Sequence, residues 1–255
     1  MIAKVPVKPL EKHDLKPVRY LVSAIICIFM MYAGNILGTI ITALLQLLPG
    51  ISAGNPILSY ATDNALLPKI LFMVILAPVI EEYIFRKQLI DRMHVYGEKL
   101  AVITSALMFG LFHGNLSQLF YAFALGLVFG YVYLKTGKLR YSISLHMLIN
   151  FIGSVAGPFF LEKIAVLGTM ETLDMVALES IMPWLIGFGA YVLVLIGLAI
   201  TGLVLLCINK RKVSFAPAEL ELPKDDRFMT VYGNVGMILL VVGCTALIVA
   251  SLIPL

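Results

Sequence analysis

Charged residues are scarce in this chain of 255 residues. They make up 13% of the sequence against 60% for apolar residues, and the mean hydropathy is +0.97. An ordinary globular domain is about 25% charged and about 45–50% apolar. Residues 20–49 contain no charge at all, and a run of that length is typical of a membrane span. The composition therefore excludes a soluble protein and predicts one polytopic membrane domain over residues 1–255.

Other absences exclude further classes of function. The net charge is +4, but no basic cluster with interleaved aromatic residues is present, so nucleic acid is not an expected partner. The three cysteines lie in apolar runs at unrelated spacings, which argues against a disulfide or metal set. The sequence has no HExxH motif, no GxSxG motif and no paired aspartate motif. These absences exclude the local zincin helix and the serine nucleophile elbow.

The apolar residues gather in seven segments, at 20–49, 67–90, 100–113, 117–134, 141–158, 181–208 and 229–254. Each is predicted to be helical, because lipid offers no partner to an unpaired backbone group. We expect an all-α integral membrane protein, a bundle of about seven to eight transmembrane helices with a buried polar cavity open to the cytoplasm. The third segment is too short to cross the bilayer. Its polar end, residues 113–115, is expected at membrane depth and under cover of protein.

Basic residues predict the orientation. Of the 19 lysines and arginines, 17 lie in four segments between or before the apolar runs: 1–19, 86–99, 135–140 and 209–228. The positive-inside rule places such segments in the cytoplasm. We therefore expect a cytoplasmic N-terminus, a cytoplasmic leader at 1–19 and a cytoplasmic loop at 209–228. The acidic loop at 159–180 is expected outside.

Two adjacent glutamates interrupt the second apolar segment. An ionisable group inside a membrane is costly unless it is paired, so it indicates a function by default. Glu82 and Arg86 stand at i and i+4 on a helix and can pair directly, which gives them a structural role. Glu81 points about 100° away from Glu82, so it is left free for chemistry. Pro78 removes one helix hydrogen bond and is expected to bend the helix nearby.

His113, His146 and Asn150 are the other polar groups in apolar segments. Each alone could be structural, as a helix cap or a polar packing patch. His146 and Asn150, at i and i+4, face the same way. Around one cavity, Glu81 and His113 could deprotonate a water while His146 and Asn150 stabilise an oxyanion. A zinc site held by Glu81, His113 and His146 is the open alternative.

Three short motifs carry a family resemblance: EE-x3-R at residues 81–86, F-x3-H at 109–113 and H-x3-N at 146–150. In this order they resemble the motifs of the CAAX protease and bacteriocin-processing family, over about residues 67–158, the expected catalytic core. The resemblance implies an integral-membrane endopeptidase. It also implies these roles: Glu81 and His113 activate water, His146 and Asn150 form the oxyanion hole, and Glu82 and Arg86 support them.

The resemblance implies a peptide or protein substrate in or at the bilayer of a bacterial plasma membrane. CAAX processing, bacteriocin maturation and self-immunity all stay open. The family carries a metalloprotease label, but we favour a metal-free glutamate mechanism without a required cofactor, because Asn150 is a poor metal ligand and a natural oxyanion donor. One alternative is a non-catalytic immunity or scaffold protein that keeps the polar cluster for structure. Another is a small proton-coupled transporter, which should show inverted repeats that the sequence lacks.

Overall fold

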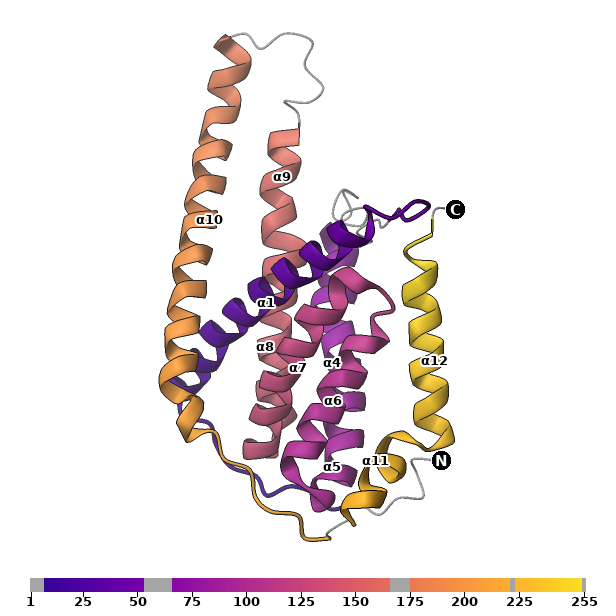
Figure 1. Cartoon of the computed structure of the whole chain (residues 1–255). Helices are drawn as coiled ribbons and strands as arrows, with labels where there is room; N and C mark the ends of the chain where they lie inside the picture. Colours follow the sequence, from indigo (N-terminus) through magenta and orange to yellow (C-terminus); the bar gives the residue numbers. More distant parts are fainter. Residues whose placement is uncertain (1–6, 53–65, 166–174, 221–222, 254–255) are drawn as a thin grey trace.

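A computed structural model of the chain describes residues 7–52, 66–165, 175–220 and 223–253 (Figure 1). Every regular element in these ranges is helical, which confirms the expected all-α membrane protein. Within them, four helices are long and apolar enough to cross a membrane: Pro17–Leu45, Leu116–Thr136, Leu139–Ala165 and Leu178–Lys212. The total of seven to eight spans stays a prediction. Parts of the expected leader (1–6), outer loop (166–174) and cytoplasmic loop (221–222) lie outside the described residues.

The first long helix, α1 (Pro17–Leu45), crosses the bundle obliquely and packs against α7 (Leu116–Thr136) and α10 (Met175–Asn209) (Figure 1). Proline at its start is already set for a helical φ angle and lacks only a hydrogen that would be unpaired there. A Cβ atom on Gly34 would overlap the backbone of Tyr121. The two helix backbones therefore approach as closely as small residues allow, which is how membrane helices associate.

The two glutamates lie on an irregular but continuous helix, which covers the predicted segment 67–90. It consists of α3 (Leu66–Pro68), η2 (Lys69–Leu76), α4 (Ala77–Glu82), η3 (Tyr83–Gln88) and α5 (Leu89–Met93), followed by the short η4 (His94–Tyr96). The elements η2 and η3 are π-helical, with hydrogen bonds that reach back five residues instead of four. Such turns are uncommon and often stand at functional sites.

The next two helices, α6 (Glu98–Phe112) and α7, form a tight antiparallel pair. Their connection is the polar turn at residues 113–115, in which Gly114 adopts a φ angle of +64° that favours glycine. A Cβ atom on Gly114 would lie 3.3 Å from the side chain of Leu247 in α12 (Val235–Ala250), so protein covers this turn in part. In Figure 1, α9 (Gly157–Ala165) and α10 extend well beyond the turn between α6 and α7.

The expected outer loop at 159–180 was wrong at both ends. The elements α8 (Leu139–Phe151), η5 (Ile152–Ala156) and α9 form one helix to Ala165, and α10 already begins at Met175. Pro158 lies inside this helix, directly after the π-helical turn η5, and the helix continues beyond it. Phe160 then packs on Tyr191 of α10, with ring centroids 5.4 Å apart. These contacts favour helix where the charged residues suggested a loop.

The expected helix at 229–254 is broken in two. The elements are α11 (Lys224–Tyr232), which begins inside the predicted cytoplasmic loop, and α12. Between them, the side chain of Asn234 accepts a hydrogen bond from the backbone N–H of Met237 at 3.0 Å. Asparagine is a preferred N-cap, so it starts a new helix here. Gly233 precedes it and weakens the continuation of α11.

The described parts of the four basic segments meet at one end of the bundle (Figure 1). Residues 7–16, here named the leader strap, run along this end. The N–H of Lys8 donates to the carbonyl of Asp91 at 3.0 Å, and the N–H of His13 donates to that of Thr136 at 2.8 Å. Residues 213–220, which follow η7 (Lys210–Lys212), run along the same end and bond the carbonyl of Val95. This arrangement agrees with the predicted orientation, and the cytoplasmic N-terminus itself stays a prediction.

Asp14 fastens the leader strap to the start of α8, and its replacement by alanine is expected to loosen the strap. The Asp14 carboxylate accepts hydrogen bonds from Lys138 at 2.7 Å and from Arg140 at 2.6 Å. The hydrogen bond from Lys138, then that from Tyr141, hold the pKa of Asp14 below its usual range. Such attachment is complete above the usual pKa of about 3.9 and is lost as the pH falls through the lowered folded value.

At pH 7 we expect Asp14→Ala to speed hydrogen–deuterium exchange of the leader strap by about 2- to 5-fold, the effect of an exposed ion pair. Glu11→Ala is the matched control, because Glu11 lies in the same strap but contacts only His13 among the described ion pairs. Equal exchange in both variants would contradict the assignment.

Candidate active site

Glu82 and Arg86 form a fully buried ion pair. Both side chains have an exposed fraction of 0%, and Arg86 Nε lies 3.1 Å from Glu82 Oε2. Arg86 also donates to Ser105 Oγ of α6 at 2.7 Å, and its guanidinium lies 4.8 Å from the centre of the Phe109 ring. The i and i+4 spacing thus pairs the charges as expected, and the aromatic face adds a cation–π contact. The pair ties the glutamate helix to α6.

His146 of α8 lies between the two glutamates. Its Nδ1 is 3.2 Å from Glu82 Oε1, and its Nε2 is 3.6 Å from Glu81 Oε2. The imidazole stacks on Phe129, with ring centroids 5.1 Å apart, which fixes the plane of the ring. The side chain of Glu81 is 20% exposed, while that of Glu82 is 0% exposed. The two neighbouring carboxylates therefore differ in environment, and only Glu81 is accessible.

The structure brings the predicted catalytic residues together. Glu81, His113, His146 and Asn150 all line one cavity of about 170 Å³. The remaining lining residues come from the glutamate helix, α6, α7 and η5: Met73, Ala77, Phe109, Gln118, Tyr121, Ala122, Leu125 and Ser154. Glu81 is the one carboxylate in this lining. Whether the cavity opens to the cytoplasm stays a prediction.

His113 caps the end of α6 with a defined arrangement of its ring hydrogens. Its Nδ1 lies 2.8 Å from the carbonyl oxygen of Phe109, one helical turn back. A carbonyl oxygen can only accept, so Nδ1 carries the hydrogen and Nε2 of the neutral ring keeps a lone pair. His113 therefore has Nε2 available as an acceptor for a water in the cavity.

Phe109 connects the polar groups of the site. Its ring lies edge-on to His113 at 4.9 Å and to His146 at 5.5 Å between centroids, and it also faces Arg86. The side chain is 1% exposed. The phenylalanine of the F-x3-H motif thus holds both imidazoles and the guanidinium in place.

Asn150 has a structural partner that follows from Pro78. In the π-helical register of η2, the N–H of Ala77 donates to the carbonyl of Phe72, five residues back. The next carbonyl, that of Met73, would pair with residue 78, but proline has no N–H. Asn150 Nδ2 fills this position and donates to the Met73 carbonyl at 2.8 Å. One amide hydrogen of Asn150 is thus used, and the second is left for the cavity.

Gln118 and Tyr121 line the cavity but were missed in the sequence. They stand at i and i+3 on α7, one turn after the polar turn at 113–115. Two polar side chains on one face of an apolar helix were the available signal. Their role depends on where α7 lies relative to the glutamate helix, which no local pattern shows.

The residues do not form a metal site as they stand. In the described part of the chain, no three His, Cys, Asp or Glu side chains are grouped closely enough to hold a metal ion. Of the expected zinc ligands, His113 has Nδ1 on a carbonyl, and His146 has Nδ1 on Glu82 and Nε2 toward Glu81. Such Nδ1 contacts are also usual for a histidine that binds a metal through Nε2. The alternative zinc site held by Glu81, His113 and His146 stays a prediction.

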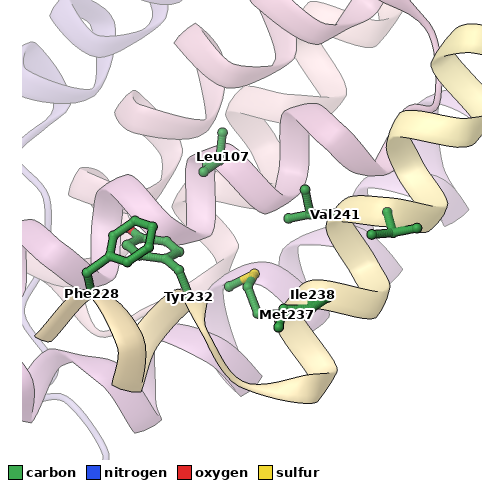
Figure 2. Close-up of a pocket in the computed structure, with 7 residues that line it drawn as sticks. Leu107, Phe228, Tyr232, Met237, Ile238 and Val241 are labelled. Atoms are coloured by element: carbon green, nitrogen blue, oxygen red, sulfur yellow. The ribbon is translucent and has the colours of Figure 1, made fainter. Parts of the chain in front are cut away.

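A larger cavity lies elsewhere, between α6 and the pair α11–α12. It measures about 380 Å³ and is lined by Leu107, Phe228, Tyr232, Met237, Ile238, Val241 and Val242 (Figure 2). None of these side chains is charged, and only the Tyr232 hydroxyl is polar, with its hydrogen-bond distance of 2.9 Å to Thr104. This cavity carries no group for acid–base chemistry.

Comparison with known proteins bears on the family resemblance. Residues 63–152 match the family model described as type II CAAX prenyl endopeptidase Rce1-like. The chain is 32% identical over 88 residues to the membrane-embedded CAAX protease MroQ of Staphylococcus aureus (strain USA300). This match covers 32% of the chain and 36% of that relative, so the chain spans about a third of its length. No solved structure matches the chain. Both matches confirm the family resemblance, and the family model covers the segment with the three motifs.

The two adjacent glutamates are expected to differ in their effect on stability. Arg86→Met leaves Glu82 as an uncompensated buried charge, which should lower the free energy of unfolding by about 3–5 kcal/mol. Glu81→Gln leaves the ion pair between Glu82 and Arg86 intact. It should therefore change the free energy of unfolding by less than about 1 kcal/mol. Denaturant titration in bicelles, followed by the fluorescence of the single tryptophan, Trp184, measures both. Lys163→Met at an exposed position is the control. Similar losses of unfolding free energy for Arg86→Met and Glu81→Gln would contradict the assignment of a structural role to Glu82 and not to Glu81.

The bond from Asn150 to Met73 predicts a rescue. Asn150→Leu leaves the Met73 carbonyl unpaired and should lower the free energy of unfolding by about 1–3 kcal/mol. In the double variant Asn150→Leu with Pro78→Ala, the new N–H of residue 78 can pair with that carbonyl, so most of the loss should be recovered. The same titration measures this cycle, with Pro78→Ala alone as reference. If the unfolding free energies lost in Asn150→Leu and in Pro78→Ala simply add in the double variant, Asn150 does not replace the N–H that Pro78 lacks.

Proposed function

Because the three-motif segment matches the CAAX protease family, we propose that the protein is an intramembrane endopeptidase. It hydrolyses a peptide bond of a membrane-associated peptide or protein. The observation that carries the proposal is the division between the glutamates: Glu82 is buried in an ion pair, and Glu81 faces the cavity with His113, His146 and Asn150. A carboxylate that is accessible in an otherwise apolar helix is suited to proton transfer.

In this proposal Glu81 and His113 activate the water. A water in the cavity donates one hydrogen to the Glu81 carboxylate and the other to Nε2 of His113, which has the free lone pair. Glu81 takes the first proton as the water oxygen forms a bond to the scissile carbonyl carbon. His146, which lies 3.6 Å from Glu81 Oε2, keeps the carboxylate in position.

Asn150 and His146 stabilise the oxyanion that this attack creates. Asn150 has one amide hydrogen beyond the one given to Met73. His146 acts in its doubly protonated form: its Nδ1–H donates to Glu82, and its Nε2–H is shared between Glu81 and the oxyanion. Donors fixed in advance in a dry site stabilise such charge more than water does. The intermediate then collapses with cleavage of the C–N bond, and the leaving amine takes the proton held by Glu81. Water is consumed, and one carboxyl and one amine are formed.

The substrate class follows from the setting of the site. The cavity lies within a membrane bundle, so the proposed substrate is a peptide or protein in or at the bilayer. We place the enzyme in a bacterial plasma membrane, and the basic segments place its N-terminus in the cytoplasm. The matched family model and the relative are both named for CAAX substrates, so a lipidated C-terminal tail is the first probe. We propose that catalysis requires no metal, because a carboxylate, an imidazole and an amide donor already supply base and oxyanion site.

Glu81→Gln is expected to abolish cleavage. The probe is an internally quenched peptide with a farnesylated CAAX tail, together with the same peptide without the lipid, both in liposomes with purified protein. Loss of a general base should lower kcat by about 10²–10⁴-fold. Glu162→Gln, at an exposed carboxylate of α9, is the matched control and should cleave as wild type does.

Full activity of Glu81→Gln would contradict the role of Glu81 as the general base. No cleavage of either probe by the wild type would support the non-catalytic immunity or scaffold alternative instead. A chelator is added to the same assay and should leave the wild-type rate unchanged. Loss of activity with chelator and its recovery with Zn²⁺ would contradict the metal-free mechanism.

A further inference from the structure

A chain of side-chain amides begins at the turn after His113 and leads to the cavity. Its first link fixes the orientation of all the others. The backbone N–H of Gln118 donates to Asn115 Oδ1 at 3.0 Å. A backbone N–H can only donate, so the atom of Asn115 that faces it is the oxygen, and the amide nitrogen is on the other side.

The second and third links follow from the first. Asn115 Nδ2 donates to the backbone carbonyl of His113 at 2.8 Å and also to Gln118 Oε1. Because Gln118 presents its oxygen to Asn115, its nitrogen Nε2 must face the hydroxyl of Tyr121, at 3.0 Å. An amide nitrogen only donates, so the phenol oxygen accepts here. The hydrogen of the Tyr121 hydroxyl is therefore not used in this contact.

The Tyr121 hydroxyl has the cavity as its remaining neighbour. Tyr121 lines the same cavity as Glu81, His146 and Asn150, and the described residues show no further hydrogen bond from it. Its position is fixed by α1, since a Cβ atom on Gly34 would overlap the Tyr121 backbone. A rigid hydroxyl with an unused hydrogen thus belongs to a residue of the same cavity as the Glu81 carboxylate.

This donor meets a need of the proposed reaction. His146 lies between two carboxylates, and Asn150 has given one hydrogen to Met73, so both are only partly available to an oxyanion. We infer that Tyr121 is a further catalytic residue, whose hydroxyl donates to the oxyanion of the scissile carbonyl, and that Gln118 is the positioning residue that directs it. The inference rests on the proposed function.

The test uses the quenched farnesylated probe in liposomes, with wild type and Glu81→Gln measured in parallel. Tyr121→Phe removes the donor and should lower kcat by about 10²–10³-fold, as for loss of one oxyanion donor, with KM nearly unchanged. Gln118→Glu keeps the hydroxyl but offers it a carboxylate, so its hydrogen turns away from the cavity and kcat should fall similarly. The double variant should be no slower than either single variant. Tyr131→Phe, on the same helix and outside the cavity lining, is the matched control.

Each result decides the inference. Wild-type kcat in Tyr121→Phe with an inactive Glu81→Gln would overturn the role of Tyr121 and leave the proposed function intact. No cleavage by the wild type would overturn both. Losses that multiply in the double variant, or appear in KM alone, would show a structural role. Where Tyr121→Phe does not fold, Gln118→Glu decides alone, because wild-type kcat in that variant overturns the inference.

Discussion

The buried ion pair between Glu82 and Arg86 is the constraint on which the site depends. An unpaired charge inside a membrane protein is costly, so Arg86 compensates Glu82 and at the same time donates to Ser105 of α6. His146 of α8 then bonds the second oxygen of Glu82. Three elements meet at one carboxylate, and this junction fixes the position of Glu81. Glu81 stays accessible, because Glu82 rather than Glu81 forms the ion pair with Arg86.

Pro78 contributes to the same junction through the hydrogen bond that it cannot make. Pro78 leaves the carbonyl of Met73 without a backbone partner, and Asn150 of α8 bonds it instead. A π-helical turn also precedes Pro158, where the N–H of Gly157 donates to the carbonyl of Ile152, and Tyr191 of α10 donates to that same carbonyl. In both places a side chain of another helix donates to a carbonyl of a π-helical turn. Helix irregularity here joins helices that are distant in sequence.

Apolar runs predicted most of the helices, and local spacing predicted part of the site. The i and i+4 separations predicted that Glu82 would meet Arg86 and that His146 and Asn150 would share a face, because helix geometry is local. The position of His146 between both glutamates depends on how α8 packs on another helix, and no spacing within α8 shows that. The extension of α9 to Ala165 likewise depends on Phe160 and Tyr191 in contact across helices. The break before Asn234 did have a local signal, a glycine followed by a capping asparagine, which the apolar run concealed.

The central claim is that two adjacent glutamates have different environments, one closed and one open to the cavity. The most direct measurement is mass-spectrometric mapping of modification by a membrane-permeant carbodiimide, which needs no substrate. With a side chain that is 20% exposed in the cavity, Glu81 should be modified, and Glu82, at 0% exposed and paired, should not. Modification of Glu82, or equal modification of both residues, would contradict the account.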